Sequence, residues 1–131
     1  MRWVFILIVA LWGGIAGAGE RLDAEAFDAL TQGKTFYYGE GGQPYGAEEY
    51  LDNRRVRWSF LDGQCKDGHW YEADGMICFA YEDAPEPHCW VFETGARGLI
   101  ARFMGETGAT ELYEMQQTRQ PLRCKGPEVG V

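Results

Sequence analysis

The spacing of hydrophobic residues along the chain changes once, near residue 33, from a helical period to a strand period. Before that point, apolar side chains recur every three or four residues and form one stripe: Leu22, Ala26, Phe27 and Leu30. Asp23 precedes most of the stripe as an N-cap, and Gly33 follows it as the residue type that ends a helix in the left-handed conformation. The pattern therefore predicts one short helix between residues 22 and 33.

Beyond residue 33, short apolar runs alternate with polar residues and are separated by turn residues. Val56, Trp58 and Phe60 alternate with polar neighbours, which is typical of a strand with one buried face. The tripeptide 73–75 contains Asp-Gly, a signal for a tight hairpin turn between two such runs. We count about seven strand-like segments at the spacing of a small all-β domain: 35–38, 55–60, 70–72, 76–81, 88–92, 99–104 and 110–115.

This series of segments predicts a mainly β fold, an antiparallel meander that closes into a small barrel or folds into a sandwich. Closure is favoured physically because it leaves no unpaired strand edge to aggregate. The helix would then cap one open end with Phe27 and Leu30. No internal repeat or linker interrupts the pattern, so residues 19–131 form a single β-rich domain.

The first 18 residues have a different character from the rest. Arg2 precedes an uninterrupted apolar run over residues 3–12, and Ala16-Gly17-Ala18 follows as a small-residue cleavage motif. These three parts make up a secretory signal peptide, and the apolar run is shorter than the ~20 residues that span a bilayer. We predict cleavage after Ala18 and a periplasmic or secreted mature protein.

Charge and composition exclude some classes of function. The chain of 131 residues carries a formal charge of −8, and loss of Arg2 with the signal peptide leaves −9. Such an acidic protein does not suit sequence-independent binding to nucleic acid or to an anionic membrane, because both require a basic surface. A basic protein partner or a small ligand fits the charge better.

Four cysteines in the mature region predict two disulfides, since the count is even and the chain is exported. The strands over 76–81 and 88–92 would form a hairpin that brings Cys78 and Cys89 opposite or diagonal to each other. Cys78–Cys89 is therefore the leading pair, and it leaves Cys65–Cys124 to tie the C-terminal tail to the middle of the domain. A metal site is disfavoured because no C-x2-C spacing occurs.

Candidate binding residues are few. Arg55 and Arg57 share one strand face and could clamp a carboxylate or phosphate, although an outward face balanced by neighbouring acids is the more ordinary interpretation.

Trp58 and Trp70 could stack on a sugar or an apolar ligand, with core packing as the default role of such aromatics. Tyr38 and Tyr45 flank a glycine-rich segment, 38–46, that we expect to be a mobile contact loop at the barrel mouth.

Catalytic candidates are weaker still. His69 and His88 could serve with a carboxylate as acid and base, but nothing in the sequence places them together or supplies a third metal ligand. Ser59 is the single serine of the mature region and lies in mid-strand without a nucleophile-elbow motif. We assign no catalytic residue, no metal and no cofactor.

Three short motifs, Gly68-His-Trp70, Ile77-Cys-Phe-Ala-Tyr81 and Cys89-Trp90, occur in this order after Gly33-Lys-Thr35. In these motifs the chain resembles a family of small, uncharacterised exported bacterial proteins of unknown function that carry G-x-W, I-C-F-x-Y and C-W. The resemblance covers most of the mature chain. It implies a periplasmic β-rich domain and no particular activity.

Three hypotheses about function follow from the sequence. The first is a non-enzymatic periplasmic binding or interaction domain, for example an inhibitor of a cationic hydrolase, which electrostatic steering would bring to the acidic surface. The second is a small barrel that binds an apolar ligand or a saccharide. The third is a hydrolase that uses His69 or His88.

Overall fold

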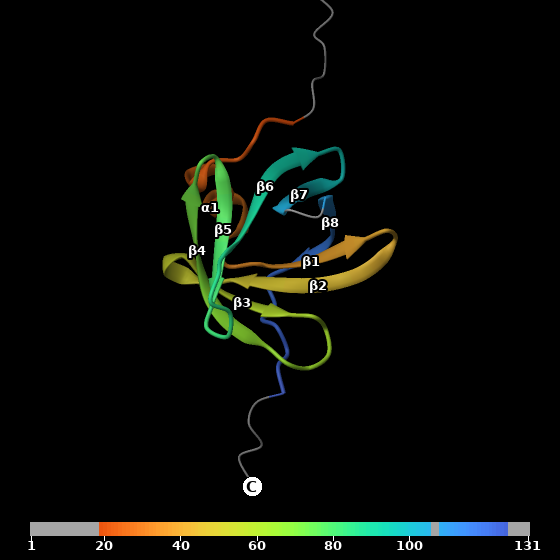
Figure 1. The fold of residues 1–131 in the computed structure, drawn as a ribbon. Coiled ribbons are helices and arrows are strands. Elements are labelled where there is room, and N and C mark those ends of the chain that lie inside the picture. Colours follow the sequence, from red (N-terminus) through yellow and green to blue (C-terminus); the bar gives the residue numbers. More distant parts are fainter. Residues whose placement is uncertain (1–18, 106–107, 126–131) are drawn as a thin grey trace, which may run out of the picture.

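The computed structural model describes residues 19–105 and 108–125, which form an eight-stranded antiparallel β-barrel with one α-helix (Figure 1). The helix α1 spans Ala24–Thr31, and a single 3-10 turn, η1, spans Asp52–Arg54. The strands are β1 (Thr35–Glu40), β2 (Gln43–Tyr50), β3 (Arg55–Ser59), β4 (Lys66–Ala73), β5 (Met76–Tyr81), β6 (His88–Gly95), β7 (Gly98–Gly105) and β8 (Gly108–Thr118).

Each strand pairs with its neighbours in the chain, and β1 pairs with β8 to close the barrel. The up-and-down order follows from the short connections, because tight turns join antiparallel strands that lie side by side. The predicted turn at Asp74-Gly75 joins β4 to β5, and both residues have positive φ. The predicted mainly β fold is therefore confirmed, with the barrel form rather than the sandwich.

The sequence pattern missed one strand. It predicts a loop over 38–46 and beyond, whereas residues 43–50 form β2 and pair with both β1 and β3. The segment was hidden because its two faces do not differ in polarity: Glu48 and Glu49 lie on opposite faces, and both are buried. The expectation of a mobile loop over 38–46 is right only for the turn at Gly41 and Gly42. The residues on either side of that turn belong to β1 and β2.

The helix α1 closes one end of the barrel, as predicted. Asp23 caps it by accepting a hydrogen bond from the Ala26 N–H at 2.8 Å, and Gly33 follows with φ of +77°. The Phe27 side chain is fully buried in the barrel end, whereas Leu30 is 38% exposed. The prediction that both residues cap the barrel is thus right for Phe27 and wrong for Leu30, which lies on the outer side of the helix.

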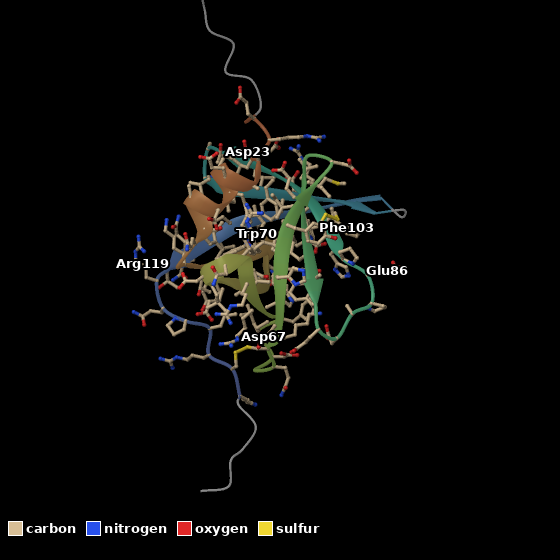
Figure 2. All side chains as sticks on the ribbon, turned by 90° about the vertical axis from the view of Figure 1, so that its left-hand side faces the viewer. Asp23, Asp67, Trp70, Glu86, Phe103 and Arg119 are labelled. Carbon is tan, nitrogen blue, oxygen red and sulfur yellow. A yellow bond between two sulfur atoms is a disulfide. The ribbon has the colours of Figure 1, made fainter. Side chains whose placement is uncertain are left out.

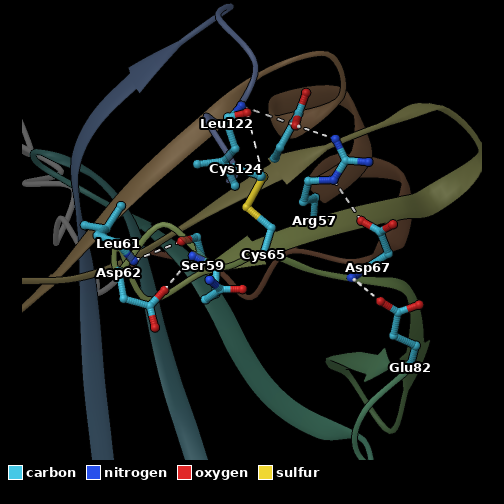
Figure 3. The surroundings of a disulfide bond; sticks show 11 residues. Arg57, Ser59, Leu61, Asp62, Cys65, Asp67, Glu82, Leu122 and Cys124 are labelled. Atoms are coloured by element: carbon cyan, nitrogen blue, oxygen red, sulfur yellow. Dashed lines mark hydrogen bonds and ion pairs between the residues drawn. A yellow bond between two sulfur atoms is a disulfide. The ribbon is translucent and has the colours of Figure 1, made fainter. Parts of the chain in front are cut away.

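Both predicted disulfides are present. Cys78 and Cys89 are directly paired across β5 and β6. Cys65, in the loop before β4, is bonded to Cys124, and the Lys125 N–H donates to the Gly63 carbonyl at 2.7 Å. The described part of the C-terminal tail, residues 119–125, is coil held against the barrel by these contacts (Figure 3).

The predicted signal peptide, residues 1–18, lies outside the described residues, and the cleavage point after Ala18 stays a prediction. Among the described residues, no helix has the length and apolar character required to cross a membrane. Two disulfides suit an oxidising compartment outside the cytoplasm.

Candidate functional site

A cavity of about 90 Å³ lies inside the barrel, lined at one end by rings that contact Phe27 of α1 and at the other by the exposed ring of Phe60. Tyr50, Phe79 and Phe92 form its inner wall and also contact Phe27, so these rings separate the cavity from the closed end. At its open end the cavity is lined by aromatic side chains from β2, β3 and β6 and from the segment after β3. An engineered apolar cavity of about 150 Å³ binds benzene, so this space suits a small group or part of a larger ligand.

Strand register places two ionisable side chains on the inner wall of the barrel, on either side of Trp58. Glu48 on β2 is paired with Trp58 on β3, and Trp58 is paired with Lys66 on β4. Because directly paired residues share a face of the sheet, all three point into the barrel. Each of them lines the cavity.

Glu48 is almost fully buried, with 2% of its surface exposed. The Tyr81 hydroxyl donates to its carboxyl group, 3.0 Å from each oxygen. Burial raises the pKa of Glu48 well above its ordinary value of 4.5, and the hydrogen bond from Tyr81 and the positive charge of Lys66 offset only part of this rise. A carboxyl group in such a place favours its neutral form until a positive charge comes near it.

Two further hydroxyl groups line the cavity close to Glu48. The Tyr38 and Tyr50 hydroxyls are hydrogen-bonded to each other at 2.8 Å. Burial raises the pKa of both tyrosines, and the negative charge of Glu48 adds to the rise. Both therefore stay neutral, and the polar floor of the cavity consists of one carboxyl group and three phenols.

Lys66 lies at the open end of the cavity, with its ammonium group over two aromatic rings. Its Nζ atom is 4.9 Å from the ring centre of Tyr81 and 5.6 Å from that of Phe60. On the outer side, the same atom lies 3.6 Å from a carboxylate oxygen of Asp83, in the β5–β6 loop. The mouth of the barrel therefore already holds one ammonium group, which interacts with ring faces and with a carboxylate.

Three rings form a cluster at the mouth. Tyr45, Trp58 and Phe60 have ring centres 5.3–5.9 Å apart. Gly46 permits this arrangement, because a Cβ atom at that position would clash with the Trp58 indole. Phe60 is 54% exposed, so the cluster extends from the cavity wall to the protein surface.

The structure brings three of the four predicted aromatic binding residues together and separates the fourth. Tyr38, Tyr45 and Trp58 line the cavity. Trp70 is 2% exposed and lies below α1, where its ring contacts Phe27 at 5.0 Å between ring centres and Arg54 covers it at 4.7 Å (Figure 2). Trp70 therefore belongs to the packed end of the barrel.

The predicted basic pair lies on the outside of the barrel. The Arg57 guanidinium donates to the Asp67 carboxylate at 2.8 Å and lies 3.9 Å from Glu49 (Figure 3). Its hydrogen bond with Asp67 raises the pKa of Arg57. Arg55 lies farther along the strand, opposite His69. Arg57 is thus neutralised by two acids, the arrangement expected of an outward face.

The two histidines point to different sides of the sheet. His88 is paired with Phe79 and lines the cavity mouth, whereas His69 is paired with Ala80, the next residue along β5. Successive residues of a strand face opposite sides, so His69 points outward. Among the residues that the structure describes, no three His, Cys, Asp or Glu side chains are grouped to hold a metal ion.

Sequence reasoning missed Glu48, Lys66 and Tyr81 as members of the site. Glu48 is one of two adjacent acids in the chain, and Lys66 directly precedes an Asp-Gly pair. A period-two signal existed for Lys66, because it lies two residues before Gly68 and four before Trp70, both inward positions of β4. Nothing in the sequence distinguishes Glu48 from Glu49 before β2 is known.

The comparisons with known proteins leave the family open. No protein-family model matches this chain. No curated protein matches it in sequence. No solved structure matches it either. The resemblance to small exported bacterial proteins therefore stays a prediction.

Proposed function

We propose that this protein is an exported, non-enzymatic binding protein that holds a small ligand in the open end of its barrel. The observation that carries the proposal is the aromatic cavity closed on one side by Phe27 and its neighbours and open on the other. Eight strands enclose a space that side chains fill or that admits one small ligand. A concave, mostly apolar site with a few polar groups is the usual form of a small-molecule site.

Several features favour binding over the hydrolase hypothesis. The polar groups of the cavity are engaged in pairs, Glu48 with Tyr81 and Tyr38 with Tyr50. His69 and His88 lie on opposite faces of the sheet, so a hydrolase site in the cavity could use His88 with a carboxylate but not His69. All four cysteines are in disulfides and offer no nucleophile.

Export to the periplasm or beyond is part of the proposal. The predicted signal peptide and the two disulfides support it together, because each is typical of an exported protein. Expression of the full chain in a bacterial host tests it. Recovery from the periplasmic fraction with Gly19 at the N-terminus is expected, and an unprocessed cytoplasmic product would contradict it.

Calorimetric titration tests the binding function. The probes are three single-ring compounds of similar size and different charge: benzylammonium, benzyl alcohol and benzoate. At least one should bind with a stoichiometry near one, and Ala101→Leu should abolish that binding, because Ala101 lines the cavity with only 1% of its surface exposed. No heat of binding with any of the three would contradict the proposal.

The matched control is Leu30→Ala, on the outer side of α1 and far from the cavity, which should bind as the wild type does. The interaction with a basic protein partner, which the net charge suggests, stays a prediction, because that charge singles out no particular surface.

A further inference from the structure

We infer that the cavity is selective for a small organic cation, an ammonium group that takes the place now held by the Lys66 ammonium between the mouth rings and Glu48. The inference rests on the proposed binding function and names the chemical class of the ligand. Four sets of contacts lead to it.

The first is the internal ammonium itself. Lys66 is an inward-facing residue of β4, and its Nζ atom lies over the rings of Phe60 and Tyr81. An ammonium group prefers the negative face of an aromatic ring, and this attraction grows when water is excluded. The barrel mouth thus has the geometry to receive a cation, with the side chain of Lys66 occupying that position in the absence of a ligand.

The second is the carboxyl group below that position. Glu48 lines the same cavity, is almost fully buried and has one hydroxyl partner, Tyr81. No cation lies within ion-pair distance of it among the described residues, since the ion pair of Lys66 is with Asp83. A buried carboxyl group ionises favourably only when a positive charge lies close to it. An entering ammonium group would supply that charge.

The third is the position of Asp83. Its side chain is 58% exposed and lies 3.6 Å from the Lys66 ammonium, in the loop that joins β5 and β6. Lys66 can therefore turn outward and keep its ion pair with Asp83 when a ligand enters. The cavity of about 90 Å³ would then grow by the space that the lysine side chain vacates.

The fourth is the ring cluster of Tyr45, Trp58 and Phe60 at the rim. Its outermost member, Phe60, is exposed and offers a face to the part of the ligand that extends beyond the cavity. The ligand class is thus an ammonium head joined to a small apolar or aromatic body. An anionic ligand would instead oppose the ionisation of Glu48 and gain no ion pair from it.

The three-probe titration, run on the wild type and three variants, tests this selectivity. In the wild type, benzylammonium should bind about tenfold or more tightly than benzyl alcohol, and benzoate most weakly. Glu48→Gln keeps the size of the side chain and removes the charge, so benzylammonium should lose its advantage over benzyl alcohol. Glu49→Gln is the matched control, because it changes the next residue on the outer face and should leave the order of the probes unchanged.

Lys66→Met removes the internal competitor and keeps the length of the side chain. Its affinity for benzylammonium should rise several-fold above that of the wild type. Tightest binding of benzoate, with a loss in Lys66→Met, would overturn the inference and make Lys66 the ligand-binding charge of an anion site. Equal binding of all three probes would overturn it too, yet leave the proposed binding function in place. Absence of binding by every probe would contradict both.

Discussion

The two ends of the barrel use the same residue types for opposite purposes. At the closed end, Phe27 packs against four aromatic rings with centre distances of 4.6–6.4 Å and leaves no exposed surface. At the open end, aromatic rings surround a cavity and reach the solvent through Phe60. The difference lies in whether a helix supplies a ring to fill the space.

This contrast separates stability from binding. Rings that fill the interior contribute transfer and packing energy, and their removal leaves a cavity. Rings that line an open cavity forgo part of that energy and keep a surface for a ligand. Substitutions at the two ends should therefore affect different measurements.

The largest expected effect is at the closed end. Phe27→Ala should lower the free energy of unfolding by about 5 kcal/mol, at the top of the range for a buried phenylalanine, because four rings lose their common partner. Urea unfolding followed by tryptophan fluorescence measures the change. Leu30→Ala, on the same helix but partly exposed, should cost less than about 1 kcal/mol. Equal losses in the two variants would mean that α1 does not close the barrel as described.

Next in size is the disulfide that anchors the mouth loop. Replacing Cys65 and Cys124 by alanine removes a bond between residues 59 apart in sequence, which the chain-entropy treatment equates with about 4 kcal/mol. Benzylammonium affinity should fall as well, because the loop before Cys65 carries Phe60. A double variant with unchanged unfolding energy and unchanged binding would show that the loop is held by other contacts.

A smaller effect, dependent on pH, should come from Glu48. Its pKa is higher in the folded than in the unfolded chain because of burial. Its contribution to stability is therefore full below pH 4.5 and is lost as the pH rises through the folded-state pKa. The glutamine in Glu48→Gln cannot ionise. As the pH rises from 4.5 to the folded-state pKa of Glu48, the free energy of unfolding of the variant should therefore increase relative to that of the wild type, by up to about 1.4 kcal/mol per pH unit.

Unfolding in urea at a series of pH values between 4 and 9 gives this difference. The groups that face Glu48, namely Tyr38, Tyr50, Tyr81 and Lys66, are present in both proteins. Glu49→Gln serves as the control for an acid removed from the outer face of β2. Parallel pH profiles of Glu48→Gln and the wild type would contradict the burial of an ionisable carboxyl group.

The smallest effect on stability should come from the rim. Phe60→Ala removes a ring that is more than half exposed, so the unfolding energy should change by less than about 1 kcal/mol. Benzylammonium affinity should nevertheless drop about three- to tenfold, since the ring under the Lys66 position is lost. Calorimetry measures the affinity and urea unfolding measures the stability of the same preparation. A stability loss as large as that of Phe27→Ala would remove the distinction between the two ends.

The sequence predicts the helix and the disulfides far better than the cavity. Phe27, Gly33 and the Cys78–Cys89 pair each follow from local patterns, namely helical spacing, left-handed glycine and hairpin register. The site depends on pairing between segments whose local signals are weak. Glu48 is inside and Glu49 outside only because β2 pairs with β3 in one register, and a shift by one residue would exchange them.

The mixture of apolar and charged residues on one face also misleads pattern analysis. Lys66 and Glu48 occupy inward positions that a filled barrel would give to apolar side chains. Local rules fail where a functional site departs from the pattern of the fold. The strand that the sequence pattern missed, residues 43–50, is therefore the one that carries the buried carboxyl group of Glu48.

The indole N–H signals of three tryptophans provide the most direct measurement of the central claim. Trp58 and Trp90 line the cavity, whereas Trp70 lies at the closed end. In ¹⁵N–¹H spectra, with signals assigned through Trp→Phe variants, saturating benzylammonium should shift the Trp58 and Trp90 signals and leave Trp70 in place. A shift confined to Trp70, or no shift in any of the three at saturation, would contradict ligand binding in the open end of the barrel.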